Sequence, residues 1–386
     1  MQSLKIDIIA FAVGLALALT LLSFCGKQAS KTCLFRTVDF HRIHRFISPY
    51  TSFYPTISEL IELVEKRSPP DKIVVVVGGD SVFNGMCQSP DKLWTDELGR
   101  LLGDRYAVTN ISFHGMHPFA AGCFVSEYLL KKGRKVICLT DGQPDKFGAG
   151  FDDQHANLYY DALFKGKLMD CKEREKVLGF ISDINEKAFN TQMIDLKLGK
   201  GMDSLFYACD FWNTIGYQRF FTIWTPATGP RFLLPRRLFK DEGEPPLYDQ
   251  PRLERELGYL KERTRHLAVL DRDGHARLIE STYKRFDAFV PALTPDELKK
   301  KLLVFQTRFN PSLRQRLTAR EASLDDEIYE LTARRFARFG YQVVTVGGDF
   351  LPSDYCDANH FSDQGGVRLA RVVAVQVEEL ARRLSY

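Results

Sequence analysis

The chain has 386 residues, of which 45% are hydrophobic and 26% charged, and 53 basic against 49 acidic residues give a net charge of +4. This ordinary globular composition excludes a wholly disordered chain, a collagen, a small disulfide scaffold and a membrane protein with many spans. It also argues against nucleic acid as a partner, because nucleic-acid binders concentrate a basic excess.

An uncharged apolar stretch lies near the amino terminus, at residues 8–24. Its length is at the lower limit for a transmembrane helix. Phe24 is too bulky for the small-residue site of a cleaved signal peptide, and it also disfavours acylation of Cys25. We therefore expect residues 1–30 to be an uncleaved single-span membrane anchor, with a buried core helix as the alternative.

The orientation of this anchor stays open on charge alone. More basic residues follow the stretch than precede it, which by the positive-inside rule favours a cytoplasmic main domain. Large domains can nevertheless cross a membrane whatever their flanking charges.

The elements that follow alternate between helix and strand. Residues 31–70 form a connector with a helix at 58–67. The β-branched run at 72–77 is typical of a strand that is buried on both faces of a parallel sheet. We then expect a helix at 89–102, a strand at 107–113, a helix at 120–132 and a strand at 135–140. This rhythm over 71–150 predicts an α/β fold, a doubly wound, mostly parallel sheet of the three-layer, flavodoxin-like kind.

The alternation stops near residue 150. Residues 151–295 are mixed and mainly helical, and six of the 17 prolines fall between Pro226 and Pro251. We expect a large insertion that caps the active edge of the sheet, or else a helical subdomain without a role there. The alternation resumes over 296–386, with strands at 302–306 and 341–346 and helices at 319–339 and 365–384.

Ser81 is the first candidate for chemistry, because it follows the strand at 72–77 on the glycine-rich turn Gly78-Gly79-Asp80. Ligands of open α/β sheets bind at this carboxyl edge of the strands. A serine is a weak nucleophile by itself and needs a base.

His360 is the candidate base, in a loop between the last predicted strand and the terminal helix. Asp357 lies three residues before it, a spacing at which a carboxylate in a tight turn reaches one imidazole nitrogen and leaves the other available as a base. The alternative for such a loop histidine is a structural role.

These segments resemble the SGNH, or GDSL-type, hydrolase superfamily over 71–148 and 302–386. Gly79-Asp80-Ser81 matches the family's first block, and Asp357 with His360 matches its last. Gly115 takes the place of the glycine of the second block. The third block is matched by Gly142-Gln143-Pro144-Asp145, in which Pro144 replaces the asparagine that donates to the oxyanion.

The resemblance implies an acyl-enzyme mechanism without metal or cofactor. Ser81 attacks an ester carbonyl, His360 transfers the proton, Asp357 orients the imidazole, and the backbone N–H groups of Ser81 and Gly115 form the oxyanion hole. Four further residues are candidates for lining the pocket: Asp80, His114, Gln143 and Asp145. His117 lies near Gly115 as well, and Asp141 is a candidate for a structural role.

The eight cysteines form no CxxC pair, and no cysteine–histidine cluster has the spacing of zinc ligands. Sequence alone leaves open whether any distant pair is oxidised.

The architecture is similar to that of the D-alanyl transfer and alginate O-acetylation proteins of the cell envelope. It implies a single-pass protein of the cytoplasmic (inner) membrane, with its main domain on the extracytoplasmic side beside a membrane-bound acyl-transfer partner. We therefore expect a membrane-anchored serine esterase or O-acyltransferase that acts on an acyl ester of an envelope glycan or lipid-linked substrate. The alternatives are a non-catalytic scaffold on a degenerate SGNH fold and a soluble lipase-like enzyme with a docking helix.

Overall fold

The computed structural model of the chain describes residues 2–29, 42–43, 52–53, 57–85, 87–88, 92–112, 119, 121–144 and 250–386. The chain divides into two compact units: Met1–Tyr54 with Lys187–Phe239, and Pro55–Glu186 with Lys240–Tyr386.

The first unit contains a long amino-terminal helix, α1 (Gln2–Ala29), and a short antiparallel pair formed by β1 (Arg42–Ile43) and β2 (Ser52–Phe53). Large apolar side chains of α1, from Ile8 to Phe24, are exposed. Among the residues that the structure describes, no helix has both the length and the apolar character needed to cross a membrane. The predicted transmembrane span is therefore not confirmed.

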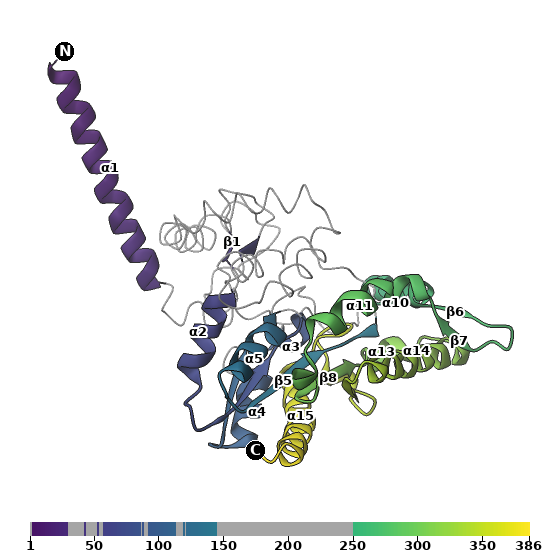
Figure 1. Ribbon diagram of the computed structural model, residues 1–386. Helices are drawn as coiled ribbons and strands as arrows, with labels where there is room; N and C mark the ends of the chain where they lie inside the picture. Colours follow the sequence, from purple (N-terminus) through teal and green to yellow (C-terminus); the bar gives the residue numbers. More distant parts are fainter. Residues whose placement is uncertain are drawn as a thin grey trace. The chain divides into compact units, whose positions relative to one another are not determined.

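The second unit is built on a parallel sheet of five strands, drawn in Figure 1. Hydrogen bonds pair them in the order β4-β3-β5-β8-β9. Their bounds are β3 Ile73–Val77, β4 Tyr106–Asn110, β5 Val136–Asp141, β8 Leu302–Thr307 and β9 Gln342–Val346. The predicted parallel α/β sheet is confirmed, and by chain position its strand order is the 2-1-3-4-5 of flavodoxin-like folds.

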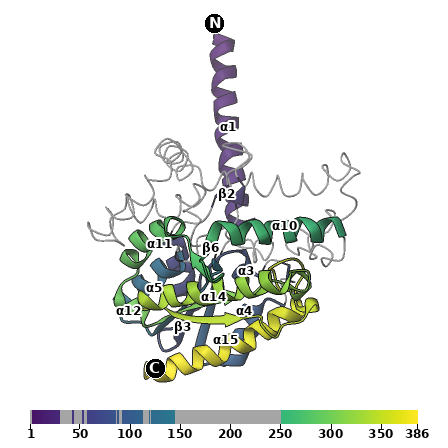
Figure 2. The ribbon, with the colours of Figure 1, turned by 90° about the vertical axis from the view of Figure 1, so that its right-hand side faces the viewer.

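Helices cover both faces of this sheet. Successive side chains of a strand point to opposite faces, so the apolar strands supply a core on each side. On one face, Val75, Ile137 and Phe305 share a core with α4 (Trp94–Leu102) and α15 (Asp363–Arg383). On the other face, the core joins strand residues Cys138 and Val304 to side chains of α5 (Ala121–Lys131) and α14 (Ala319–Arg338). Figure 2 shows α14 and α15 on opposite sides of the sheet.

The remaining helices and strands of the second unit are short or peripheral. They are α2 Ile57–Arg67, α3 Ser81–Asn84, α10 Gln250–Leu267, β6 Ala268–Leu270, β7 Ala276–Leu278, α11 Glu280–Leu293, α12 Asp296–Lys299, α13 Pro311–Arg314 and the 3₁₀ turn η6 Pro352–Asp354.

The structure describes the end of the predicted insertion, from residue 250 onward. There Tyr283 and Phe286 of α11 pack in the same core as Phe336 of α14. Residues 151–249 lie outside the described residues.

Local sequence explains where several elements begin. Thr318 caps α14 through a capping box with Glu321, and Ser362 caps α15 by accepting the N–H of Gly365. The helix predicted from residue 89 begins only at Trp94. The first N–H of this helix has a partner from outside it, because the side chain of Gln88 accepts the N–H of Trp94 at 2.8 Å.

Candidate active site

Ser81 is the first residue of the short helix α3, and the turn Gly78-Gly79-Asp80 connects it to the end of β3. β3 lies between β4 and β5, and the chain order of the strands reverses there. In open α/β sheets the crevice at this reversal is where ligands bind. The Ser81 residue is only 6% exposed, so its hydroxyl lies in a largely enclosed place.

The turn before Ser81 depends on a glycine and a carboxylate. Gly79 has a φ of +113°, and a Cβ atom there would lie 2.1 Å from Oδ1 of Asp141. That oxygen instead accepts the backbone N–H of Asp80 at 2.8 Å. Asp141, at the end of β5, therefore has the structural role considered for it, because it fixes the backbone that leads to Ser81.

Asp80, a predicted pocket residue, caps the helix that begins at Ser81. Its side chain is fully buried, and Oδ1 accepts the N–H of Val82 at 2.9 Å, which caps α3. Residues at such a cap position satisfy helix N–H groups that have no partner within the helix. The carboxylate of Asp80 thus holds α3, and with it Ser81, in place.

The structure brings Ser81, His360 and Asp357 together in one chain of hydrogen bonds. Nε2 of His360 lies 2.8 Å from Oγ of Ser81, and Nδ1 lies 2.7 Å from Oδ2 of Asp357. Asp357 is an acceptor, so the network assigns the proton of a neutral imidazole to Nδ1. Nε2 then carries the lone pair that can receive the proton of Ser81.

Asp357 stays ionised because several donors surround it. Burial raises the pKa of this carboxyl, but the hydrogen bond and electrostatic attraction of the His360 side chain, with the backbone N–H groups of His360 and Asn359, together outweigh that effect. Its Oδ1 also accepts the backbone N–H groups of Asn359 and His360, at 2.9 and 2.8 Å. The net result is a pKa of Asp357 below its usual value, which suits a group that holds and stabilises an imidazolium.

Asn310 supports the Asp357–His360 loop, a role that sequence reasoning missed. It follows β8, its Nδ2 donates to the carbonyl of Asp357 at 3.0 Å, and its backbone N–H donates to the carbonyl of Ala358 at 2.8 Å. Its Oδ1 also caps α13 by accepting the N–H of Ser312. The position of an asparagine in the turn after a buried strand is the signal that could have indicated this role.

Gln143 is described, but its amide is already engaged. The residue is 1% exposed, and its Nε2 lies 3.0 Å from the hydroxyl and 3.5 Å from the carbonyl of Thr307. Of the other predicted residues, His114, Gly115, His117 and Asp145 lie outside the described part of the chain. Of the predicted oxyanion donors, only Ser81 is therefore described.

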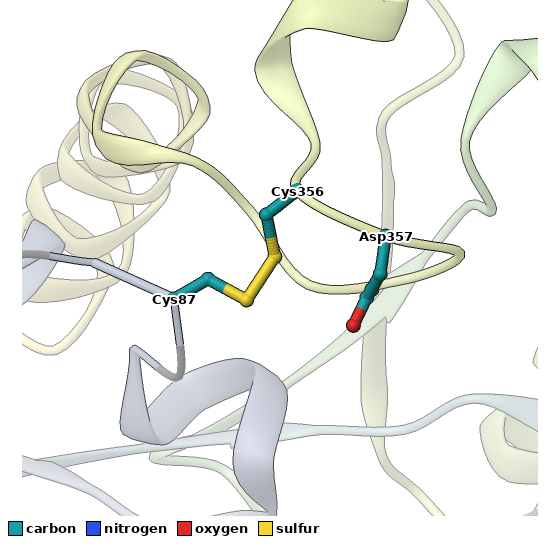
Figure 3. Close-up of side chains that lie close together, drawn as sticks. All are labelled: Cys87, Cys356 and Asp357. Carbon is teal, nitrogen blue, oxygen red and sulfur yellow. A yellow bond between two sulfur atoms is a disulfide. The ribbon is translucent and has the colours of Figure 1, made fainter. Parts of the chain in front are cut away.

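A disulfide joins Cys87 to Cys356, next to Asp357, as Figure 3 shows. These three residues are also a group whose ligand-type atoms lie within 4.8 Å of one another. The two sulfurs are joined in a covalent bond, and Asp357 is hydrogen-bonded to His360. The group is therefore not arranged to hold a metal ion.

Comparisons of the chain with protein-family models, with curated proteins and with solved structures found no match.

Proposed function

We propose that the chain is a serine esterase or O-acyltransferase of the SGNH type. The observation that carries this proposal is the continuous hydrogen-bonded chain Ser81–His360–Asp357 at the carboxyl edge of a parallel sheet. A serine hydroxyl, an imidazole and a carboxylate in this sequence of contacts form the constellation that activates a nucleophile.

The proposed reaction proceeds in two steps. The Oγ of Ser81 attacks an ester carbonyl while Nε2 of His360 takes its proton, and the same nitrogen then protonates the departing alkoxide. Water or an acceptor hydroxyl then attacks the acyl-enzyme while Nε2 of His360 takes its proton. The bond between the acyl group and Oγ breaks, and the proton passes from Nε2 to Oγ, which regenerates Ser81. Hydrolysis and transfer differ only in that second nucleophile.

We further propose that the substrate is an acyl ester of a cell-envelope glycan or of a lipid-linked compound, and that residues 8–24 attach the protein to the cytoplasmic membrane beside an acyl-transfer partner. The exposed apolar side chains of α1 support attachment to a lipid surface. The Cys87–Cys356 disulfide supports an extracytoplasmic location for the main domain, because such bonds persist in oxidising compartments.

A non-catalytic binding or scaffold protein is the second candidate, and the third block favours it. Pro144 has no side-chain donor, and the contacts of Gln143 Nε2 with Thr307 argue against Gln143 as a substitute for the missing asparagine. Losing one oxyanion donor typically costs about 10²–10³ in rate.

Labelling with a fluorophosphonate serine probe separates the two candidates. In the full-length protein we expect labelling of the wild type and its loss in Ser81→Ala and His360→Ala. Ser126→Ala, which removes a fully buried serine of α5, is the matched control and should label like the wild type. A folded wild type that does not label would favour the scaffold.

A further inference from the structure

The Cys87–Cys356 disulfide connects the two segments that carry the candidate triad. Cys87 lies in the turn that follows α3, the helix that begins at Ser81, and Cys356 immediately precedes Asp357. The two cysteines are 269 residues apart in the sequence, and both are buried. In Figure 3 the bond crosses from the segment after α3 to the loop that bears Asp357.

The backbone at Cys87 is held in a conformation that cysteine rarely adopts. Its φ is +78°, in the left-handed region that favours glycine. Such a conformation persists when the surrounding structure imposes it. Here it places the sulfur of Cys87 where it can bond to Cys356.

Asp357 and His360 form a unit within their loop. The carboxylate of Asp357 accepts hydrogen bonds from the backbone N–H and from the ring Nδ1–H of His360. The N–H of Cys356 donates to the carbonyl of His360 at 3.0 Å. Asn310 ties the same loop to the end of β8. These bonds fix the shape of the loop, whereas the disulfide ties it to the segment of Ser81.

A neighbouring contact supports the same connection. Gln88 packs against α15 so closely that a Cβ atom on Gly366 would lie 2.7 Å from its Nε2. Residues 87 and 88 thus both contact the carboxyl-terminal segment, and only the contact of Cys87 is covalent.

We propose that the Cys87–Cys356 disulfide is a positioning element that holds Nε2 of His360 within hydrogen-bond reach of Ser81. The claim about position stands on the geometry, while its consequence for activity rests on the proposed function. When the bond is reduced, the Asp357–His360 pair stays intact but moves relative to Ser81. A misplacement of about 1 Å can cost roughly 10² in rate.

The first test compares the full-length protein before and after reduction with dithiothreitol. Each sulfur of the bridge gains one electron and one proton, and the dithiol is oxidised to its cyclic disulfide. With folding checked by near-ultraviolet circular dichroism, we expect fluorophosphonate labelling of Ser81 to slow about 10²-fold on reduction and to recover on reoxidation. The remaining labelling should also become insensitive to the substitution His360→Ala.

Two variants control for the other cysteines. Cys87→Ser/Cys356→Ser should label as slowly as the reduced protein and should not respond to dithiothreitol. Cys123→Ser removes a buried thiol that is outside the bridge and should keep the full response. An unchanged labelling rate in the folded, reduced wild type would overturn the proposal.

A nuclear magnetic resonance measurement tests the position of His360 without using activity. In the oxidised protein, Ser81→Ala should shift the ¹⁵N resonance of His360 Nε2, because it removes the hydrogen-bond partner of that nitrogen. In the reduced protein the same substitution should have no effect. An equal shift in both states would overturn the inference, whereas an oxidised wild type that never labels would overturn the proposed function alone.

Discussion

Oδ1 of Asp141 occupies the space that a side chain at Gly79 would need, and it accepts the N–H of Asp80 at 2.8 Å. The end of β5 thereby fixes the turn that presents Ser81 at the end of β3. The position of the nucleophile thus depends on a contact between two neighbouring strands as well as on its own turn.

Gly79→Ala should severely destabilise the protein and abolish labelling of Ser81. The new methyl group meets a buried carboxylate, and alanine at a positive φ adds a conformational cost of about 1–2 kcal/mol. Gly133→Ala is the matched control, since Gly133 also has a positive φ but no atom within 4 Å of its added Cβ. Urea unfolding measures both; equal losses of unfolding free energy would show that the contact with Asp141 has no importance.

Asp357→Asn should lower the rate of labelling by roughly 10³–10⁴, because an amide no longer favours the proton on Nδ1 and cannot stabilise an imidazolium. Single-turnover labelling at neutral pH measures this loss. A rate within tenfold of the wild type would contradict the role assigned to Asp357.

The same variant should alter the pH dependence of stability. The pKa of Asp357 is lower in the folded protein than its usual value of 3.8, so its contribution is complete above that value and is lost as the pH falls through the folded pKa. The difference in unfolding free energy between the wild type and Asp357→Asn should therefore shrink in acid. A difference that grows as the pH falls would have the wrong sign.

Asn310→Ser should lower the rate of Ser81 labelling markedly, whereas the free energy of unfolding should fall only a little. Serine can still cap α13 by accepting the N–H of Ser312, but it loses the donor to the carbonyl of Asp357. We expect a stability loss of about 1 kcal/mol, typical of one hydrogen bond. Asn310→Ala removes the cap as well and should cost about 1 kcal/mol more. Equal stability of the two variants would contradict the double role of Asn310.

Pro144→Asn introduces the side-chain donor that the resemblance to SGNH hydrolases implies at this position, and under the proposed function it should raise the rate of acyl-enzyme formation. A recovered oxyanion donor is worth up to roughly 10²–10³ in rate. Burst kinetics with an activated ester measures the change, with Ser81→Ala/Pro144→Asn as the background. An unchanged burst rate would mean that residue 144 is not at the oxyanion.

The sequence predicted the strands well because Val74 to Val77 and Leu302 to Phe305 are continuous apolar runs, which is what burial on both faces of a parallel sheet requires. It also predicted that Ser81, Asp357 and His360 come together. It could not predict the pairing of Cys87 with Cys356, because neither cysteine belongs to a motif that indicates its partner, whereas Ser81 and His360 lie in recognisable motifs.

The start of α4 was predicted wrongly, and the cap made by Asp80 was not predicted. A serine–proline pair such as that at 89–90 often begins a helix. Here the helix begins at Trp94, and the side chain of Gln88 accepts its first N–H. The carboxylate of Asp80 caps α3 by accepting the N–H of Val82. Both contacts are local in the chain, but a serine–proline pair and a glycine-rich turn do not by themselves indicate them.

Trapping of the acyl-enzyme tests the central claim most directly. The full-length wild type is mixed with p-nitrophenyl acetate, quenched in acid and digested, and the acetylated peptide is identified by mass spectrometry. We predict acetyl on Ser81 in the wild type, much less in His360→Ala and none in Ser81→Ala. A folded wild type that acquires no acetyl group on Ser81 would contradict the account.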